Sequence, residues 1–218
     1  MLTGLSVVRR HYVIVGVVIA SLMMIKGGYM QAKAHFAQYL IEQAWQRTLV
    51  DNLAHKPWSW ADTFPVAKLS FVHQPEAQQG DDLFVLAGAS GRNLAFGPAA
   101  ILGNSEVNRW GNTIIAGHRD THFARLKGVT VGQLIKLQDS GGTERLYRVS
   151  STHIVEEHDT QLLFAADGLQ LTLITCYPFE ELSEHSKLRF VVIALPMDSA
   201  SLTEDSLAKL DRHDSISA

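Results

Sequence analysis

Hydrophobic and polar positions divide the chain into an apolar N-terminal stretch, a helical segment and a longer region of short alternating runs. Residues 12–25 carry no charge and follow the basic triplet RRH. This run is shorter than the about 20 residues that cross a bilayer, but it approaches that length if it continues to Met30 and Lys26 extends its amine to the interface. We therefore expect residues 1–31 to form a cytoplasmic basic segment followed by a transmembrane signal-anchor.

A cleaved signal peptide is the alternative for the same stretch, because Ala32-Lys33-Ala34 resembles an A-x-A cleavage site. Lys26 and Lys33 fit poorly in a cleavage region, so we favour the uncleaved anchor. Either interpretation exports the rest of the chain, because the arginines near the N-terminus hold that end in the cytoplasm. We expect a single-pass protein of the inner (cytoplasmic) membrane, with its folded domain on the periplasmic or extracytoplasmic side.

Residues 32–50 have the spacing of an amphipathic helix. Two adjacent rows carry its apolar side chains, namely Phe36, Leu40 and Ala44 in one and Ala37, Ile41, Trp45 and Leu49 in the other. We expect this helix to dock on its own domain, and a helix for a membrane surface or a partner is the alternative. Pro57 and Pro65 exclude regular structure after it, so residues 32–65 are expected to combine the helix with an aromatic, proline-rich linker.

From residue 66 the pattern changes to short runs typical of β-strands, separated by turn residues. The candidate strands are 66–72, 82–88, 112–118, 133–139, 145–155, 169–175 and 188–195. The sequence SGGT at 140–143 is typical of a hairpin turn. Closely spaced strands without alternating helices predict a mainly β sandwich or a small closed barrel over residues 66–198. Residues 199–218 are polar and predict a loose tail or a marginal last helix.

Composition narrows the possible partners and cofactors. The formal net charge is −3 and no long basic run occurs, which gives no electrostatic reason to expect a nucleic acid partner. The chain has one cysteine, Cys176, which excludes an internal disulfide and a zinc site built only from thiolates. We expect no cofactor, and no acidic cluster argues for calcium.

Cys176 ends an apolar run that predicts a buried strand, and Pro178 follows it closely. A cysteine at a strand end is either a small buried residue or a reactive thiol, and the second needs a neighbouring base or cation. His118 is the best candidate base, because it also follows an apolar run that ends in Gly117. The alternative for His118 is a polar surface residue.

Arg189 is the third candidate, as a stabiliser of an oxyanion. Alternation within KLRFVVIAL puts it on one face with Val191, Ile193 and Leu195. We take that face to point inward, where a cation needs an anion as its partner. The alternative is an arginine that faces solvent at the start of a strand.

Together these segments resemble the sortases, the cysteine transpeptidases of cell surfaces. LTLITCYP carries the TLxTC pattern of that family, NTIIAGHRDTHF is similar to its histidine segment, and LRFVVIAL is similar to its arginine strand. The segment GASGRNLAFGPAAILG resembles its early barrel strands. The resemblance covers about residues 55–197, and the wording of KPWSWADTFPVAKL and TCYPF is most similar to sortases of Gram-negative, largely marine, proteobacteria.

The resemblance implies an eight-stranded β-barrel and a thiol protease mechanism. It implies Cys176 as nucleophile, His118 as general acid/base, Arg189 as stabiliser of substrate and oxyanion, and Thr175 as a residue that lines the substrate site. The implied substrate is an exported protein with an LPxTG-like C-terminal sorting signal. The enzyme would cleave after the threonine, hold the acyl group as a thioester and pass it to an amine acceptor that the sequence does not identify.

Two other readings compete with a sortase. A zinc-dependent hydrolase would use His118, Asp120 and His122 on one face of a strand, but it lacks a third firm ligand and leaves Cys176 without a role. A membrane-anchored β-domain that only binds a partner would not depend on Cys176. A serine hydrolase is excluded at GASG, because the spacing and the strand-to-helix context of a nucleophile elbow are absent.

Overall fold

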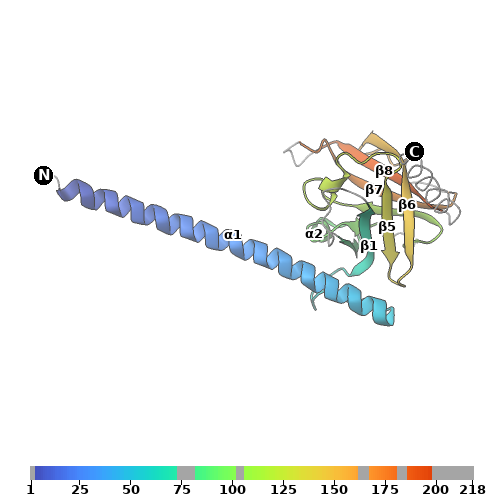
Figure 1. The fold of residues 1–218 in the computed structure, drawn as a ribbon, viewed down its shortest axis with the longest axis horizontal. Coiled ribbons are helices and arrows are strands. Elements are labelled where there is room, and N and C mark those ends of the chain that lie inside the picture. Colours follow the sequence, from blue (N-terminus) through green and yellow to red (C-terminus); the bar gives the residue numbers. More distant parts are fainter. Residues whose placement is uncertain (1–2, 73–81, 102–105, 162–166, 181–185, 198–218) are drawn as a thin grey trace, which may run out of the picture. The chain divides into compact units, whose positions relative to one another are not determined.

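The computed structural model describes residues 3–72, 82–101, 106–161, 167–180 and 186–197. Within these residues eight strands close into a barrel (Figure 1). The strands are β1 (Pro65–Val72), β2 (Leu83–Ala87), β3 (Ala99–Ala100), β4 (Gly111–Ala116), β5 (Leu134–Asp139), β6 (Glu144–Glu156), β7 (Leu169–Tyr177) and β8 (Leu188–Pro196). Their spatial order is β1-β2-β3-β4-β7-β8-β6-β5, and β5 pairs with β1 to close the barrel. The prediction of a small closed barrel is therefore confirmed.

Seven of the strands coincide with the alternating runs of the sequence, and the hairpin predicted at 140–143 joins β5 to β6. In this turn Gly142 has a φ of 82°, a left-handed conformation that glycine adopts without a steric penalty. The side chain of Asp139 accepts a hydrogen bond from the Thr143 N–H at 2.9 Å. The sequence pattern missed β3, because a strand of two alanines has no alternation to detect.

The two parallel pairings of the barrel determine where the strand ends meet. β2 pairs with β3 in parallel, and β4 pairs with β7 in parallel, whereas β7 pairs with β8 in antiparallel fashion. The C-terminal ends of β4 and β7 and the N-terminal end of β8 consequently lie side by side. The three candidate residues occur at this end of the barrel.

The inner face of the barrel holds the main hydrophobic core. Its completely buried side chains include Leu69, Val85, Ile115, Phe123, Leu126, Ile135, Leu137, Tyr147, Leu171, Leu173 and Val192. Each fully buried side chain of this size contributes about 1.5–3 kcal/mol to folding. The Tyr147 hydroxyl donates a hydrogen bond of 2.9 Å to Asn108 Oδ1, which satisfies the one polar group that Tyr147 brings into the core.

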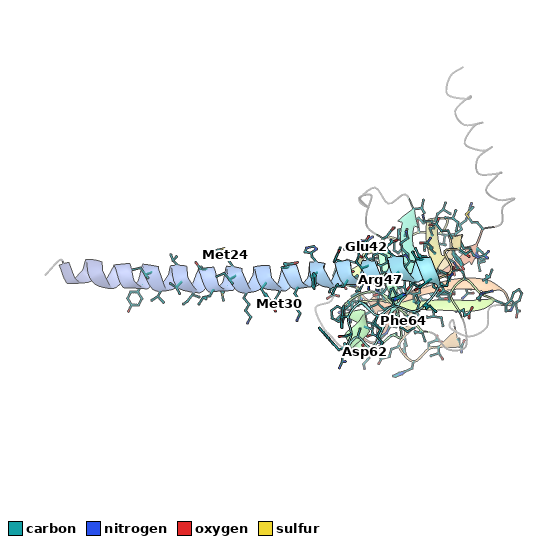
Figure 2. All side chains as sticks on the ribbon, turned by 90° about the horizontal axis from the view of Figure 1, so that it is seen from below. Met24, Met30, Glu42, Arg47, Asp62 and Phe64 are labelled. Atoms are coloured by element: carbon teal, nitrogen blue, oxygen red, sulfur yellow. The ribbon has the colours of Figure 1, made fainter. Side chains whose placement is uncertain are left out.

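The N-terminal helix α1 runs without interruption from Thr3 to Asp51. The segment predicted as an anchor and the helix predicted at 32–50 are thus one helix. Within the described residues one helix, over Ile14–Asp51, is long and apolar enough to cross a membrane, although a signal sequence has the same properties. Figure 2 shows Met24 and Met30 as side chains on this helix.

The chain forms two compact units, Met1–Leu40 and Ile41–Ala218. Within the second unit the last turns of α1 bury Ile41, Ala44 and Trp45, and Ile41 joins Leu86 and Ala99 in a second hydrophobic cluster. From Ile41 onward, the expected docking of the helix on its own domain is confirmed.

The helix ends through local backbone chemistry. Asn52 adopts a φ of 59°, and its N–H donates to the Thr48 carbonyl at 2.8 Å, which is the hydrogen bonding of a left-handed C-terminal cap. Asp51 Oδ1 accepts from the Leu53 N–H at 2.9 Å. Two short helices complete the described fold, α2 (Gly91–Leu94) and the 3-10 helix η1 (His122–Leu126). The polar tail predicted at 199–218 lies outside the described residues.

Candidate active site

Cys176 lies one residue before the end of β7 and is partly exposed. Leu171 and Leu173 of the same strand point into the barrel core. Because side chains alternate along a strand, Cys176 lies on the opposite, outer face of the barrel. A thiol in this position is reachable from solvent and is not one of the core residues.

Arg189 is the direct cross-strand partner of Cys176, since their Cα atoms are paired in the antiparallel register of β7 and β8. Side chains paired in this way lie on the same face, with Cβ atoms about 4.5–5.5 Å apart. The expectation that Arg189 faces inward is wrong. Val192 and Ala194 belong to the buried core, whereas Leu195, on the face of Arg189, is 47% exposed. Arg189 therefore lies with Cys176 on the outer face.

His118 reaches the same edge from the parallel pairing of β4 and β7. Ala116 is paired with Ile174, and the Gly117 N–H donates to the Ile174 carbonyl at 3.1 Å. His118 is the next residue, two positions beyond the last register pair, so its chain segment leaves β4 beside the end of β7 that carries Cys176. The His118 side chain is exposed. The fold thus pairs Cys176 with Arg189 and brings the segment that carries His118 to the same end of the barrel, and the catalytic roles of the three residues stay predictions.

Gly117 and Thr175 connect the segment that carries His118 to β7. Thr175 is 2% exposed and its hydroxyl donates to the Gly117 carbonyl at 2.8 Å. A Cβ atom on Gly117 would lie 2.6 Å from Cγ of the buried Phe123, so the site requires a residue without a side chain. Thr175 links the two segments, and its contact with substrate stays a prediction.

Two further contacts connect the chain after His118 to the chain after Cys176. Arg119 Nη1 donates to the Pro178 carbonyl at 3.0 Å, and Lys127 Nζ forms an ion pair of 2.7 Å with Glu180. The peptide bond between Tyr177 and Pro178 is cis. The rings of Tyr177, Phe179 and Phe190 contact one another near this end of the barrel.

Arg189 has an anionic partner that the sequence did not indicate. Its Nη2 donates to Glu157 Oε2 at 3.0 Å, and its Nη1 donates to the carbonyls of Ser186 at 2.7 Å and Leu188 at 3.0 Å. Glu157 follows the end of β6, and no sequence pattern reveals that β6 pairs with β8. The inward orientation was wrong, but the expectation that this cation needs an anion is met by Glu157.

The geometry assigned to the zinc alternative does not occur. β4 ends at Ala116, and His122 begins the 3-10 helix η1, so His118, Asp120 and His122 do not share a strand face. Among the described residues no three His, Cys, Asp or Glu side chains gather into a group that could hold a metal ion. Burial lowers the pKa of His122, with smaller contributions from the positive charges of Arg125 and His118. His122 is thus a partly buried imidazole near His118.

Comparison with known proteins agrees with this arrangement. Residues 76–197, more than half of the chain, match the family model described as the sortase domain. Sortase D of Bacillus subtilis (strain 168) is 34% identical over 83 residues, which cover 38% of this chain and 41% of that protein. The alignment therefore spans less than half the length of this relative.

Solved structures of sortases share the fold. A sortase D5 transpeptidase of Clostridium perfringens superimposes with a TM-score of 0.54 at 19% identity, over 72% of this chain and 89% of that one. Sortase A from Corynebacterium diphtheriae gives a TM-score of 0.53 at 22% identity, over 77% of this chain and 85% of that one. The similarity to sortases of Gram-negative proteobacteria in particular stays a prediction. With the match to the family model over residues 76–197, these findings show that the chain belongs to the sortase family.

Proposed function

We propose that this protein is a cysteine transpeptidase that cuts an exported protein at a C-terminal sorting signal and joins it to an amine. The observation that carries the proposal is the register of β4, β7 and β8 at one end of the barrel. Cys176 is paired directly with Arg189, and the β4–β7 pairing ends two residues before His118, at Ala116 and Ile174, which supports a position of His118 near the same cysteine. A nucleophile, an acid/base and a cation then meet on one outer surface.

The first half-reaction forms a thioester. The Cys176 thiolate attacks the carbonyl carbon of the substrate threonine, and the carbonyl π electrons move onto oxygen. Arg189 donates N–H groups to this oxyanion, which carries more charge than the ground-state carbonyl and therefore binds more strongly. As the C–N bond breaks, His118 gives its proton to the departing amine. The acyl group remains on sulfur, and His118 is left neutral.

The second half-reaction reverses these roles on a new amine. Neutral His118 accepts a proton from the attacking acceptor amine, whose nitrogen forms a bond to the thioester carbon. The C–S bond then breaks and returns the Cys176 thiolate. Splitting the exchange into two steps lets the two amines occupy the site in turn, which is the advantage of a covalent intermediate.

The substrate class follows from the family to which the chain belongs. We infer an LPxTG-like sorting signal at the C-terminus of a cell-surface protein, and an acceptor amine on the same side of the membrane. The apolar part of α1 supports an enzyme anchored in the inner membrane with its barrel on the extracytoplasmic side. Enzyme and exported substrate would then meet at one membrane surface.

Intact-mass measurement tests the nucleophile. The full chain in detergent is incubated with a sorting-signal peptide without an added amine and quenched in acid. Wild type should gain the mass of the acyl fragment, the gain should disappear on treatment with hydroxylamine, and Cys176→Ala should show none. An adduct of equal yield on Cys176→Ala would reject the assignment.

The same experiment separates the competing readings. Addition of a metal chelator should leave the adduct yield unchanged, whereas loss of activity that zinc restores would support the hydrolase. Peptide binding of equal affinity in wild type and Cys176→Ala, with no adduct and no cleavage in either, would support a non-catalytic binding domain.

A further inference from the structure

Arg189 is held by three acceptors before any substrate is bound. These are one carboxylate oxygen of Glu157 and the carbonyl oxygens of Ser186 and Leu188, at 2.7–3.0 Å from the guanidinium nitrogens. A free arginine side chain has many rotamers, and fixing it opposes binding through lost conformational entropy. The three bonds fix the side chain in the folded protein, so a substrate meets a cation that is already oriented.

Glu157 is itself fixed by the fold. The register of β6 and β8 pairs Val155 with Arg189, and Glu157 continues the outer face of Val155. Its N–H donates to the Lys187 carbonyl at 2.8 Å, just beyond the last register pair. The spatial order β7-β8-β6 puts Arg189 between the cysteine strand and the strand that leads to Glu157. The carboxylate therefore approaches the guanidinium from the side opposite Cys176.

We propose that Glu157 is a positioning residue for Arg189 in the transfer reaction, an inference that rests on the proposed function above. A guanidinium has five N–H donors in a fixed plane, more than these three bonds occupy. Holding Nη2 from the β6 side fixes the plane in which the remaining donors meet an oxyanion over Cys176. Glu157 acts through Arg189 and does not contact the reacting atoms.

The solvent exposure of Arg189 and Glu157 indicates whether loss of Glu157 should change the melting temperature or the turnover. The side chains of Arg189 and Glu157 are 27% and 34% exposed, and ion pairs with this much solvent contribute little to folding stability. Orientation has the larger effect, because a donor misplaced by about 1 Å can cost about 100-fold in rate. Loss of Glu157 should therefore lower turnover and leave the melting temperature unchanged.

The first test compares Glu157→Gln with Glu156→Gln in the full chain in detergent. Glu156 is exposed, ends β6 and matches Glu157 in charge, so its variant is a control for the loss of one negative charge. We expect Glu157→Gln to lower kcat by about 10-fold or more with little change in KM. Glu157→Asp should recover part of the loss, and Glu156→Gln should behave like wild type. Equal kcat in wild type and Glu157→Gln, or a higher one, would overturn the proposal.

A double-mutant cycle tests whether the effect passes through Arg189. In an Arg189→Ala background Glu157→Gln should cause no further loss of turnover. A full additional loss there would show that Glu157 acts elsewhere and would also overturn the proposal.

A measurement without substrate separates this inference from the proposed function. Nitrogen-15 relaxation of the Arg189 Nε–H, assigned by its disappearance in Arg189→Ala, reports motion of the guanidinium. The relaxation should indicate a rigid guanidinium in wild type and Glu156→Gln and a mobile one in Glu157→Gln. Equal mobility in all three would reject Glu157 as a positioning residue even if the Cys176 adduct forms. If no adduct forms, the function fails while the relaxation data still decide the role of Glu157.

Discussion

Arg189 tests whether the site depends on the shape of a cation or only on its charge. Arginine offers a planar fork that can hold a carbonyl and a developing oxyanion in fixed directions, whereas lysine keeps the charge without the fork. We expect Arg189→Lys to lower kcat/KM about 100- to 1000-fold, the usual cost of losing an oxyanion donor, with an unchanged melting temperature. Turnover and thermal unfolding are measured together for wild type, Arg189→Lys and Arg189→Ala.

Either of two results would change this interpretation of Arg189. Turnover of Arg189→Lys near that of wild type would reduce Arg189 to a point charge beside Cys176. Unfolding of both variants would make it a structural residue that ties Glu157 to β8.

At the same scale, the sequence identified single residues better than it identified their surroundings. Cys176 and His118 were found because each follows an apolar run of the sequence, and the barrel brings the ends of β4 and β7 together. Arg189 was assigned to the wrong face because β8 is apolar on both sides, with Val191 and Val192 both buried. Glu157 was not found, because its role depends on the pairing of β6 with β8, which joins residues far apart in the chain.

Among the elements, the junction between β4 and η1 controls the position of His118. Gly117→Ala would put a Cβ within 2.6 Å of the buried Phe123 ring, and overpacking of this kind typically costs about 1–3 kcal/mol. We expect lower stability and lower turnover together, because relief of the clash must move the segment that carries His118. Denaturant unfolding and turnover of the full chain check both effects.

Gly168→Ala is the matched control for this junction. Gly168 lies beside the opposite end of the β4–β7 pair, its carbonyl accepts from the Gly111 N–H, and nothing lies within 4 Å of an added Cβ. Its variant should stay within about 0.5 kcal/mol of wild type. Equal losses of stability in the two variants would show that an added methyl group destabilises the β4–β7 pair at either end and that the clash with Phe123 is not the cause.

The strands themselves were predictable because strands with one face in the core alternate buried and exposed positions, as in β5, where Ile135 and Leu137 are buried between partly exposed neighbours. The parallel pairing of β4 with β7 was not, since it joins segments that are far apart in the chain and leaves no local signature. That pairing brings the segment that carries His118 to the end of β7 where Cys176 lies. The residues of the site were therefore readable from the sequence, whereas their convergence at one edge came from the fold and from the family resemblance.

At the scale of the whole molecule, α1 is the candidate for a membrane anchor. Its apolar segment and the possible cleavage site Ala32-Lys33-Ala34 lie within one unbroken helix, and Lys26 and Lys33 flank or occupy that site. Because the lysines suit a cleavage region poorly and the backbone there is paired within the helix, we expect the segment to stay attached.

Intact mass of the protein extracted from membranes decides between an anchored and a secreted enzyme. An anchored wild type should retain the full 24.1 kDa chain and remain in the membrane fraction after a carbonate wash. Ala34→Arg, which removes the small residue that the A-x-A site requires, should then differ from wild type only by the mass of the substitution. A wild-type chain that begins at His35, beside an Ala34→Arg chain of full length, would instead establish cleavage. The enzyme would then be secreted, and it would reach its substrate and the acceptor amine without a membrane anchor of its own.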